Sequence, residues 1–186
     1  TYDYLLYLVV LLQMPTLFFF LQSFVGAELN AVDIAGRICS MGMLCGTFGI
    51  NVAHELGHRN NKFEQALAKT LLLSSLYMHF FIEHNKGHHK HVATPNDPSS
   101  ARYNEWVYTF YFRTIVFSYL SAWHIANDEM KKKGKAVFSI YNEMLQAHLI
   151  QIALVIGIYF VFGLGIMLFF LLAAFMGILL LETVNY

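Results

Sequence analysis

The chain has 186 residues, of which 57% are hydrophobic and only 13% are charged, and its formal net charge is zero. A soluble domain is about 45–50% apolar and about 25% charged, so the composition indicates a protein that crosses a membrane several times. The zero net charge provides no basic surface for nucleic acid, and two cysteines within one apolar stretch predict no disulfide framework.

Two apolar stretches come first in the chain. Residues 4–25 are long enough to span a bilayer, because a spanning helix needs about 20 apolar residues. A short polar link, 27–33, precedes a second apolar stretch, 34–53, which leads directly into His54. The sequence lacks an initiator methionine and begins and ends in apolar segments, so we expect it to be a fragment of a longer protein, truncated at both ends.

Two middle segments are predicted to lie at the membrane surface. Residues 66–82 are apolar but only 17 long, at the lower limit for a span. Residues 106–125 carry Arg113 near their centre, and an arginine at mid-bilayer would cost at least about 2.5–3.5 kcal/mol. We therefore expect 106–125 to form an interfacial helix, and 66–82 to enter the membrane surface and return without crossing.

The last apolar stretch, 145–182, is too long for one pass at about 1.5 Å per residue, which predicts a helical hairpin that turns near 162–165. Lysines and arginines concentrate in residues 59–135 and are absent from the link 27–33, so the positive-inside rule places 59–135 in the cytoplasm. The predicted fold is an all-α, polytopic membrane helical bundle that forms a single domain over residues 1–186.

Five of the nine histidines form two clusters. His54 and His58 are four residues apart, which places both imidazoles on one face of a helix. His84 and His88 repeat this spacing, and His89 adds an imidazole turned about 100° around the helix, where it could reach a second metal. Imidazole pairs at this spacing can bind a divalent metal. We therefore predict a metal centre on the cytoplasmic side with these ligands: His54, His58, His84, His88 and His89.

The donor set favours iron over zinc. The motif His-Glu-x-x-His at 54–58 is also the signature of zinc proteases, so an intramembrane zinc protease is one alternative. A catalytic zinc needs three protein ligands and one open position, whereas five clustered histidines suit a pair of iron ions. A metal transporter, with histidines facing each other across spanning helices, is a second alternative.

At these residues the sequence resembles the bacterial membrane alkane hydroxylase family (alkane 1-monooxygenase), within the membrane fatty acid desaturase and hydroxylase superfamily. The resemblance covers about 51–186 and is carried by residues 54–59, 83–89 and 92–102, the last of which include Ala93-Thr94-Pro95-Asn96-Asp97-Pro98. The final pair, Asn185-Tyr186, resembles the start of the family's Asn-Tyr-x-Glu-His-Tyr-Gly motif. Fatty acid desaturases share the histidine motifs but usually space them differently.

The resemblance implies a six-helix protein of the bacterial inner (plasma) membrane, with two iron ions held by nine histidines on the cytoplasmic side. It implies rubredoxin and its reductase as electron donors, O2 as oxidant, and an alkane that enters from the membrane lipids and leaves as a 1-alkanol. The five clustered histidines match family ligands, and the other four would follow Tyr186, so we expect this fragment to be inactive alone. A fatty acid desaturase, or a hydroxylase of another apolar substrate, is the alternative.

Two acidic residues adjoin predicted ligands. Glu55 follows His54 and Glu83 precedes His84, so each carboxylate either accepts a hydrogen bond from an imidazole or lies on a helix surface. Asp97 lies between Pro95 and Pro98, which favour a rigid turn, and we expect its carboxylate to cap that turn rather than to take part in catalysis.

The remaining histidines are predicted to be structural. His79 lies in an apolar run and is expected to be buried and hydrogen-bonded. His91 is expected to face solvent in a loop, and His124 and His148 to pack or lie at the interface.

Overall fold

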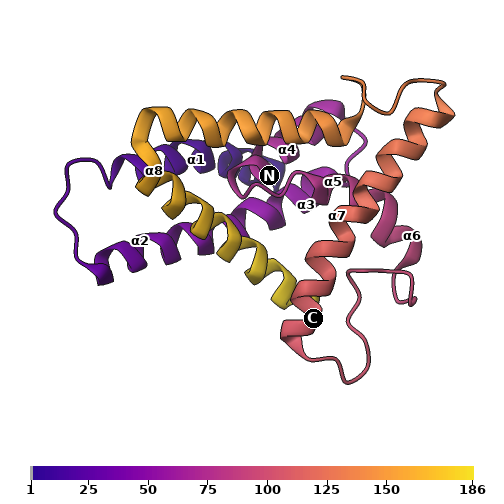
Figure 1. Ribbon diagram of the computed structural model, residues 1–186, viewed down its shortest axis with the longest axis horizontal. Helices are drawn as coiled ribbons and strands as arrows, with labels where there is room; N and C mark the ends of the chain where they lie inside the picture. Colours follow the sequence, from indigo (N-terminus) through magenta and orange to yellow (C-terminus); the bar gives the residue numbers. More distant parts are fainter. Residues whose placement is uncertain (1) are drawn as a thin grey trace. The chain divides into compact units, whose positions relative to one another are not determined.

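The computed structural model describes residues 2–186, and all the regular elements in that range are helices (Figure 1). The elements are α1 (Tyr2–Gln22), α2 (Ala31–Leu44), the π-helix η1 (Cys45–Ile50), α3 (Asn51–Gly57), α4 (Lys62–Ser74), α5 (His79–Glu83), the π-helix η2 (His84–His88), α6 (His89–His91), α7 (Val107–Lys132) and α8 (Glu143–Asn185). The predicted all-α class is confirmed. The chain divides into a first unit, Thr1–Tyr77 with Gln151–Leu181, and a second unit, Met78–Ile150 with Glu182–Tyr186.

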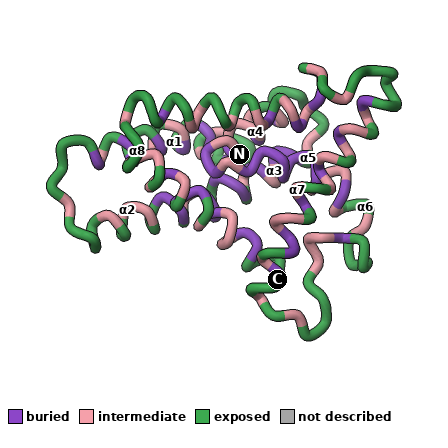
Figure 2. Tube along the Cα trace, in the orientation of Figure 1, coloured by how far each residue is buried: buried purple, intermediate pink, exposed green. Residues whose placement is uncertain are grey.

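Two helices in residues 2–186 are long and apolar enough to cross a membrane by length and composition, namely α1 and α8. Much of the first arm of α8 is exposed (Figure 2), and few of its residues before Phe170 are buried. Large apolar side chains such as those of Phe160 and Val161 are exposed. Apolar surface of this extent is unfavourable in water and suits contact with lipid. The number of crossings and the cytoplasmic placement of 59–135 stay predictions.

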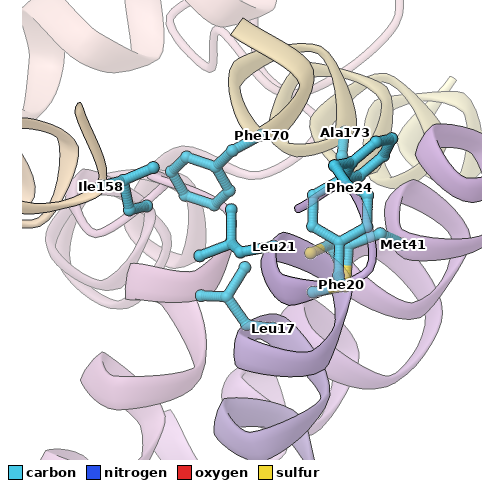
Figure 3. Close-up of a cluster of buried hydrophobic side chains, with 9 residues drawn as sticks. Leu17, Phe20, Leu21, Phe24, Met41, Ile158, Phe170 and Ala173 are labelled. Carbon is cyan, nitrogen blue, oxygen red and sulfur yellow. The ribbon is translucent and has the colours of Figure 1, made fainter. Parts of the chain in front are cut away.

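The core of the first unit forms where α1 meets α2 and α8. Buried side chains of Leu17, Phe20, Leu21, Phe24, Met41, Cys45, Ile158, Phe170 and Ala173 make up this cluster (Figure 3). Small residues let the backbones approach closely, because a Cβ at Gly46 would lie 2.9 Å from the carbonyl oxygen of Gly177. Membrane helices often pack through small residues in this way. A larger side chain at position 46 or 177 would therefore force α8 away from η1.

Residues 31–57 form one continuous helical path, as the stretch 34–53 leading into His54 predicts. It begins earlier than expected because Asn30 caps α2, accepting hydrogen bonds from the backbone N–H groups of Val32 and Asp33 at 2.9 and 3.0 Å. The π-helix η1 lies inside this path, immediately before α3. Single π turns within α-helices are frequent at functional sites.

The apolar segment 66–82 is divided between two helices, α4 and α5. The break falls at Leu76, whose φ of 53° is in the left-handed region that interrupts a right-handed helix. With 13 residues, α4 is about 20 Å long, shorter than the roughly 30 Å hydrocarbon core of a bilayer. The length of α4 agrees with the prediction that residues 66–82 do not cross the bilayer. That prediction still requires a measurement of membrane topology.

The predicted turn within the last apolar stretch is confirmed at Gly163. Its φ of 84° and ψ of 172° interrupt α8 and divide it into two helical arms (Figure 1). This backbone region is open almost only to glycine, because any Cβ would clash with the neighbouring peptide. Gly163 therefore permits the chain to reverse direction.

Replacing Gly163 with alanine is expected to destabilise the protein by about 1–3 kcal/mol, since an L-residue must either adopt this strained conformation or straighten the turn. Thermal unfolding in detergent, followed by circular dichroism, measures the effect. Gly165→Ala is the matched control, because a Cβ there meets nothing within 4 Å and lies in a regular helical arm. Equal unfolding temperatures for the two variants would contradict the assignment.

In the second unit, α7 extends seven residues beyond the predicted segment 106–125. Arg113, which suggested an interfacial helix, is buried, and its guanidinium donates to Glu105 Oε1 at 2.7 Å. It also donates to the carbonyl oxygens of Pro98 and Ser100, both at 2.8 Å. The charge of Arg113 is therefore compensated by protein groups and does not itself require a helix at the membrane surface, so the interfacial location stays a prediction.

Candidate metal centre

The first histidine pair lies at the end of α3, as its spacing predicts. His54 belongs to the helix and His58 caps its C-terminus. Their Nε2 atoms are 2.9 Å apart, and their rings meet edge to face with centroids 4.5 Å apart. Both imidazoles thus present the same nitrogen to one point.

The second cluster differs from the predicted i,i+4 pairing. His84 Nε2 lies 3.0 Å from Nε2 of His89, whereas the rings of His84 and His88 are stacked with centroids 5.1 Å apart. The reason is the π turn of η2, in which the backbone N–H of His89 donates to the carbonyl oxygen of His84. The wider turn brings residue i+5 to the side of residue i, where an α-helix would turn it away. His84 and His89 therefore form the closer pair.

Ion pairs and a glycine hold η2 in the second unit. Lys86 Nζ lies 2.7 Å from Glu129 of α7 and 3.2 Å from Glu143 at the start of α8. A Cβ at position 87 would lie only 2.6 Å from Glu83 Oε1, so Gly87 allows the turn to pack on that buried carboxylate. These contacts fix the backbone that carries the three histidines.

The two imidazole pairs fit metal binding. Histidine nitrogens bind first-row metals at about 2.1 Å, so two ligands are about 3.0 Å apart at a right angle and about 3.4 Å apart at a tetrahedral angle. The spacings of 2.9 and 3.0 Å are close to these values, so each imidazole pair has a geometry compatible with two ligands on one ion. A proton shared between neutral imidazoles would give a similar spacing. The two imidazoles of each pair are therefore close enough to share either a metal ion or a proton.

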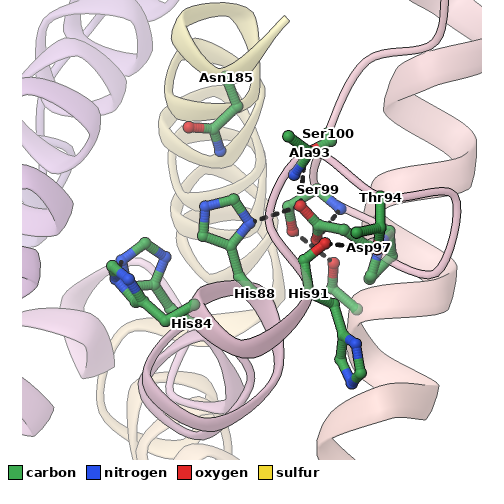
Figure 4. Close-up of polar contacts among 12 residues, drawn as sticks. His84, His88, His91, Ala93, Thr94, Asp97, Ser99, Ser100 and Asn185 are labelled. Atoms are coloured by element: carbon green, nitrogen blue, oxygen red, sulfur yellow. Dashed lines mark hydrogen bonds and ion pairs between the residues drawn. The ribbon is translucent and has the colours of Figure 1, made fainter.

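His88 binds Asp97 instead of another histidine. Its Nδ1 lies 2.8 Å from Asp97 Oδ2, and Asp97 is only 1% exposed (Figure 4). The predicted capping role is confirmed, because the backbone N–H of Ser99 donates to Asp97 Oδ1 at 3.0 Å. The contact between Asp97 and His88 was not predicted from the sequence. The only sequence feature that could have indicated it is an acidic residue in a proline-bounded turn that follows the second histidine cluster. His88 also lines a cavity of about 680 Å³ with Asn185 and Tyr186.

The two predicted carboxylate partners have different environments. Glu55 is half-exposed and forms a 3.6 Å ion pair with Arg59. Glu83 is buried, and its desolvation, with the charges of Asp97 and Glu182, raises the pKa of the carboxyl group to about 7. Whether either carboxylate accepts a hydrogen bond from an imidazole N–H stays a prediction.

The other histidines have largely the surroundings that the sequence predicts. His79 is buried with its ring edge-on to Tyr119, and burial lowers its pKa to about 3, so the ring is neutral. His148 packs on α7, where its Nε2 accepts a 2.9 Å hydrogen bond from the Tyr119 hydroxyl. His124 is exposed. The prediction for His91 is wrong, because this residue ends α6 and is half-buried instead of facing solvent in a loop.

The chain is similar to known proteins over most of its length. Residues 34–186 match the family model described as Fatty acid desaturase. Alkane 1-monooxygenase 1 of Pseudomonas aeruginosa is 43% identical over 151 residues, which are 81% of this chain and 40% of that protein. Alkane 1-monooxygenase of Ectopseudomonas oleovorans is 36% identical over 155 residues, 83% of this chain and 38% of the relative.

A more distant relative is named for a different kind of substrate. The xylene/toluene monooxygenase hydroxylase component of Pseudomonas putida is 27% identical over 123 residues, 66% of this chain and 33% of that protein. The chain spans about 40% or less of the length of the curated relatives it matches.

Proposed function

The chain belongs to the fatty acid desaturase family, and from this premise we propose that it is part of a membrane di-iron monooxygenase that hydroxylates the terminal carbon of alkanes. One observation carries the proposal: imidazole nitrogens pair at 2.9 and 3.0 Å in a chain that is 36–43% identical to alkane 1-monooxygenases. Residues 1–186 would form a single desaturase-like membrane domain within the longer protein.

Both histidine clusters would serve one centre, because neither alone supplies the ligands that two iron ions need. His54, His58, His84, His88 and His89 are the proposed ligands in this chain, and further ligands would come from elsewhere in the protein. The zinc-protease alternative is disfavoured because a catalytic zinc needs only three protein ligands, whereas this chain has five clustered histidines and belongs to the fatty acid desaturase family.

The iron ions would supply the oxidising power, drawn from O2, that breaks a strong, nonpolar C–H bond, since acid–base side chains cannot activate such a bond. The protein would orient the imidazoles and keep the centre dry. Alkanes partition into the bilayer, so the exposed apolar faces of α1 and α8 suit substrate entry from the lipid. Electrons would come from rubredoxin and its reductase, with the centre on the cytoplasmic side of a bacterial inner membrane.

A second candidate substrate is an aromatic methyl group. The similarity to the xylene/toluene monooxygenase hydroxylase component favours it. The same centre would serve either substrate, because both contain a methyl C–H bond and the benzylic bond of the aromatic substrate is the weaker of the two.

The complete protein, supplied in membranes with rubredoxin, rubredoxin reductase and O2, tests the proposal when octane and para-xylene are offered separately. Formation of 1-octanol supports alkane hydroxylation, whereas 1-octene indicates a desaturase and a methylbenzyl alcohol alone indicates the second candidate. Elemental analysis is expected to find about two irons per chain. One zinc and no iron would refute the proposal.

A further inference from the structure

Asp97 is built into the second unit as a hydrogen-bond acceptor with fixed partners. Its Oδ2 lies 2.8 Å from His88 Nδ1 and accepts a hydrogen bond from the Ser100 hydroxyl at 2.5 Å. Its Oδ1 accepts from the backbone N–H of Ser99 at 3.0 Å. Since the residue is 1% exposed, its carboxylate is held in place by these contacts and not by solvent.

The turn that carries Asp97 is anchored from α7. The guanidinium of Arg113 donates to the carbonyl oxygens of Pro98 and Ser100, one residue on either side of Ser99. Arg113 is in turn fixed by Glu105, at 2.7 Å. The carboxylate of Asp97 is therefore positioned by a rigid turn.

This contact selects one tautomer of His88. An ionised carboxylate only accepts hydrogen bonds, so Nδ1 of His88 must carry the proton and Nε2 must keep its lone pair. In Figure 4 the ring of His88 turns Nδ1 toward Asp97 and its other nitrogen away from it. His84 and His89 also present Nε2, the atoms that lie 3.0 Å apart. The three imidazoles of the cluster thus offer the same nitrogen.

We propose that Asp97 is a positioning residue that holds His88 in the tautomer and orientation of a metal ligand, an inference that rests on the proposed function. A carboxylate on the outer nitrogen of a ligating imidazole fixes the ring and increases its basicity, and removing such a partner typically lowers metal affinity about 10–100-fold. Asp97 therefore acts through His88 and does not touch the substrate.

The test compares Asp97→Asn and Asp97→Glu in the complete protein, with Asp128→Asn as control. Asp128 is an exposed carboxylate on α7 that forms a 3.4 Å ion pair with Lys131. Competition with a chelator measures iron affinity, and Mössbauer spectroscopy reports the ligand environment. Asp97→Asn is expected to bind iron about 10–100-fold more weakly with an altered spectrum. Asp97→Glu should recover part of the affinity, and Asp128→Asn should match the wild type.

Wild-type affinity and an unchanged spectrum in Asp97→Asn would overturn the inference. If Asp97→Asn does not give a monodisperse protein, Ser100→Ala is tested in its place, because it keeps the carboxylate but removes one of its hydrogen-bond donors. A several-fold loss of iron affinity in Ser100→Ala supports the proposal, and an unchanged iron affinity overturns it. Iron binding is measured apart from turnover. An iron-loaded wild type that does not hydroxylate alkanes would thus refute the proposed function alone, whereas a wild type that binds no metal would refute both.

Discussion

Replacing His84 with alanine in the complete protein is expected to abolish alkane hydroxylation and to lower iron affinity by more than about tenfold, while the protein still inserts into the membrane. His84 Nε2 lies 3.0 Å from Nε2 of His89, so the change removes one of the two donors that are proposed to share an ion. Membrane insertion depends on apolar length, which the substitution leaves unchanged. Elemental analysis and product detection measure the two effects.

The π turn makes a sharper version of this prediction possible. If His84 and His89 share an ion, the double variant His84→Ala/His89→Ala should bind iron no more weakly than either single variant, because residues that act as a unit are not additive. His124→Ala is the control, since His124 is exposed on α7 and should leave iron content unchanged. Full hydroxylation by His84→Ala would exclude His84 as a ligand.

The sequence predicts the helical class and the positions of the longest segments because these depend on local apolar length. The same reasoning locates the reversal at Gly163, where several glycines interrupt a stretch too long for one pass. It does not predict the break at Leu76, because a leucine in the left-handed region has no distinctive signature in an apolar run. Only the packing around that turn selects such a conformation.

The histidine pairs show the limit of periodicity. The 100° rotation per residue of an α-helix correctly pairs His54 with His58. It fails for His84, because η2 is a π turn and brings His89 to the position expected for His88. The bond between His88 and Asp97 joins residues nine apart across a turn, a contact that depends on how residues 92–100 fold. That the two clusters form one metal centre stays a prediction. It rests on the argument that neither cluster alone supplies enough ligands for two iron ions.

Replacing Arg113 with methionine is expected to cost about 3–5 kcal/mol of stability, the largest effect on folding that we predict. The Glu105 side chain, only 7% exposed, would remain buried without its cation, and removing one partner of a buried ion pair has this cost. The carbonyl oxygens of Pro98 and Ser100 would also lose their donor. Lys132→Met is the control, because the side chain of Lys132 is exposed at the end of the same helix, α7.

The dependence of stability on pH should identify the ion pair as the cause. Hydrogen bonding to Arg113 lowers the pKa of Glu105 from 4.5 to about 2. A carboxyl group with a lowered pKa in the folded state stabilises the protein above its unfolded pKa, and this contribution is lost as pH falls from about 4.5 to about 2. Thermal unfolding at pH 7 and pH 3 should therefore show a smaller acid-induced loss in Arg113→Met than in Lys132→Met. Equal losses, or equal stability of the two variants at pH 7, would show that the pair does not hold the turn that carries Asp97.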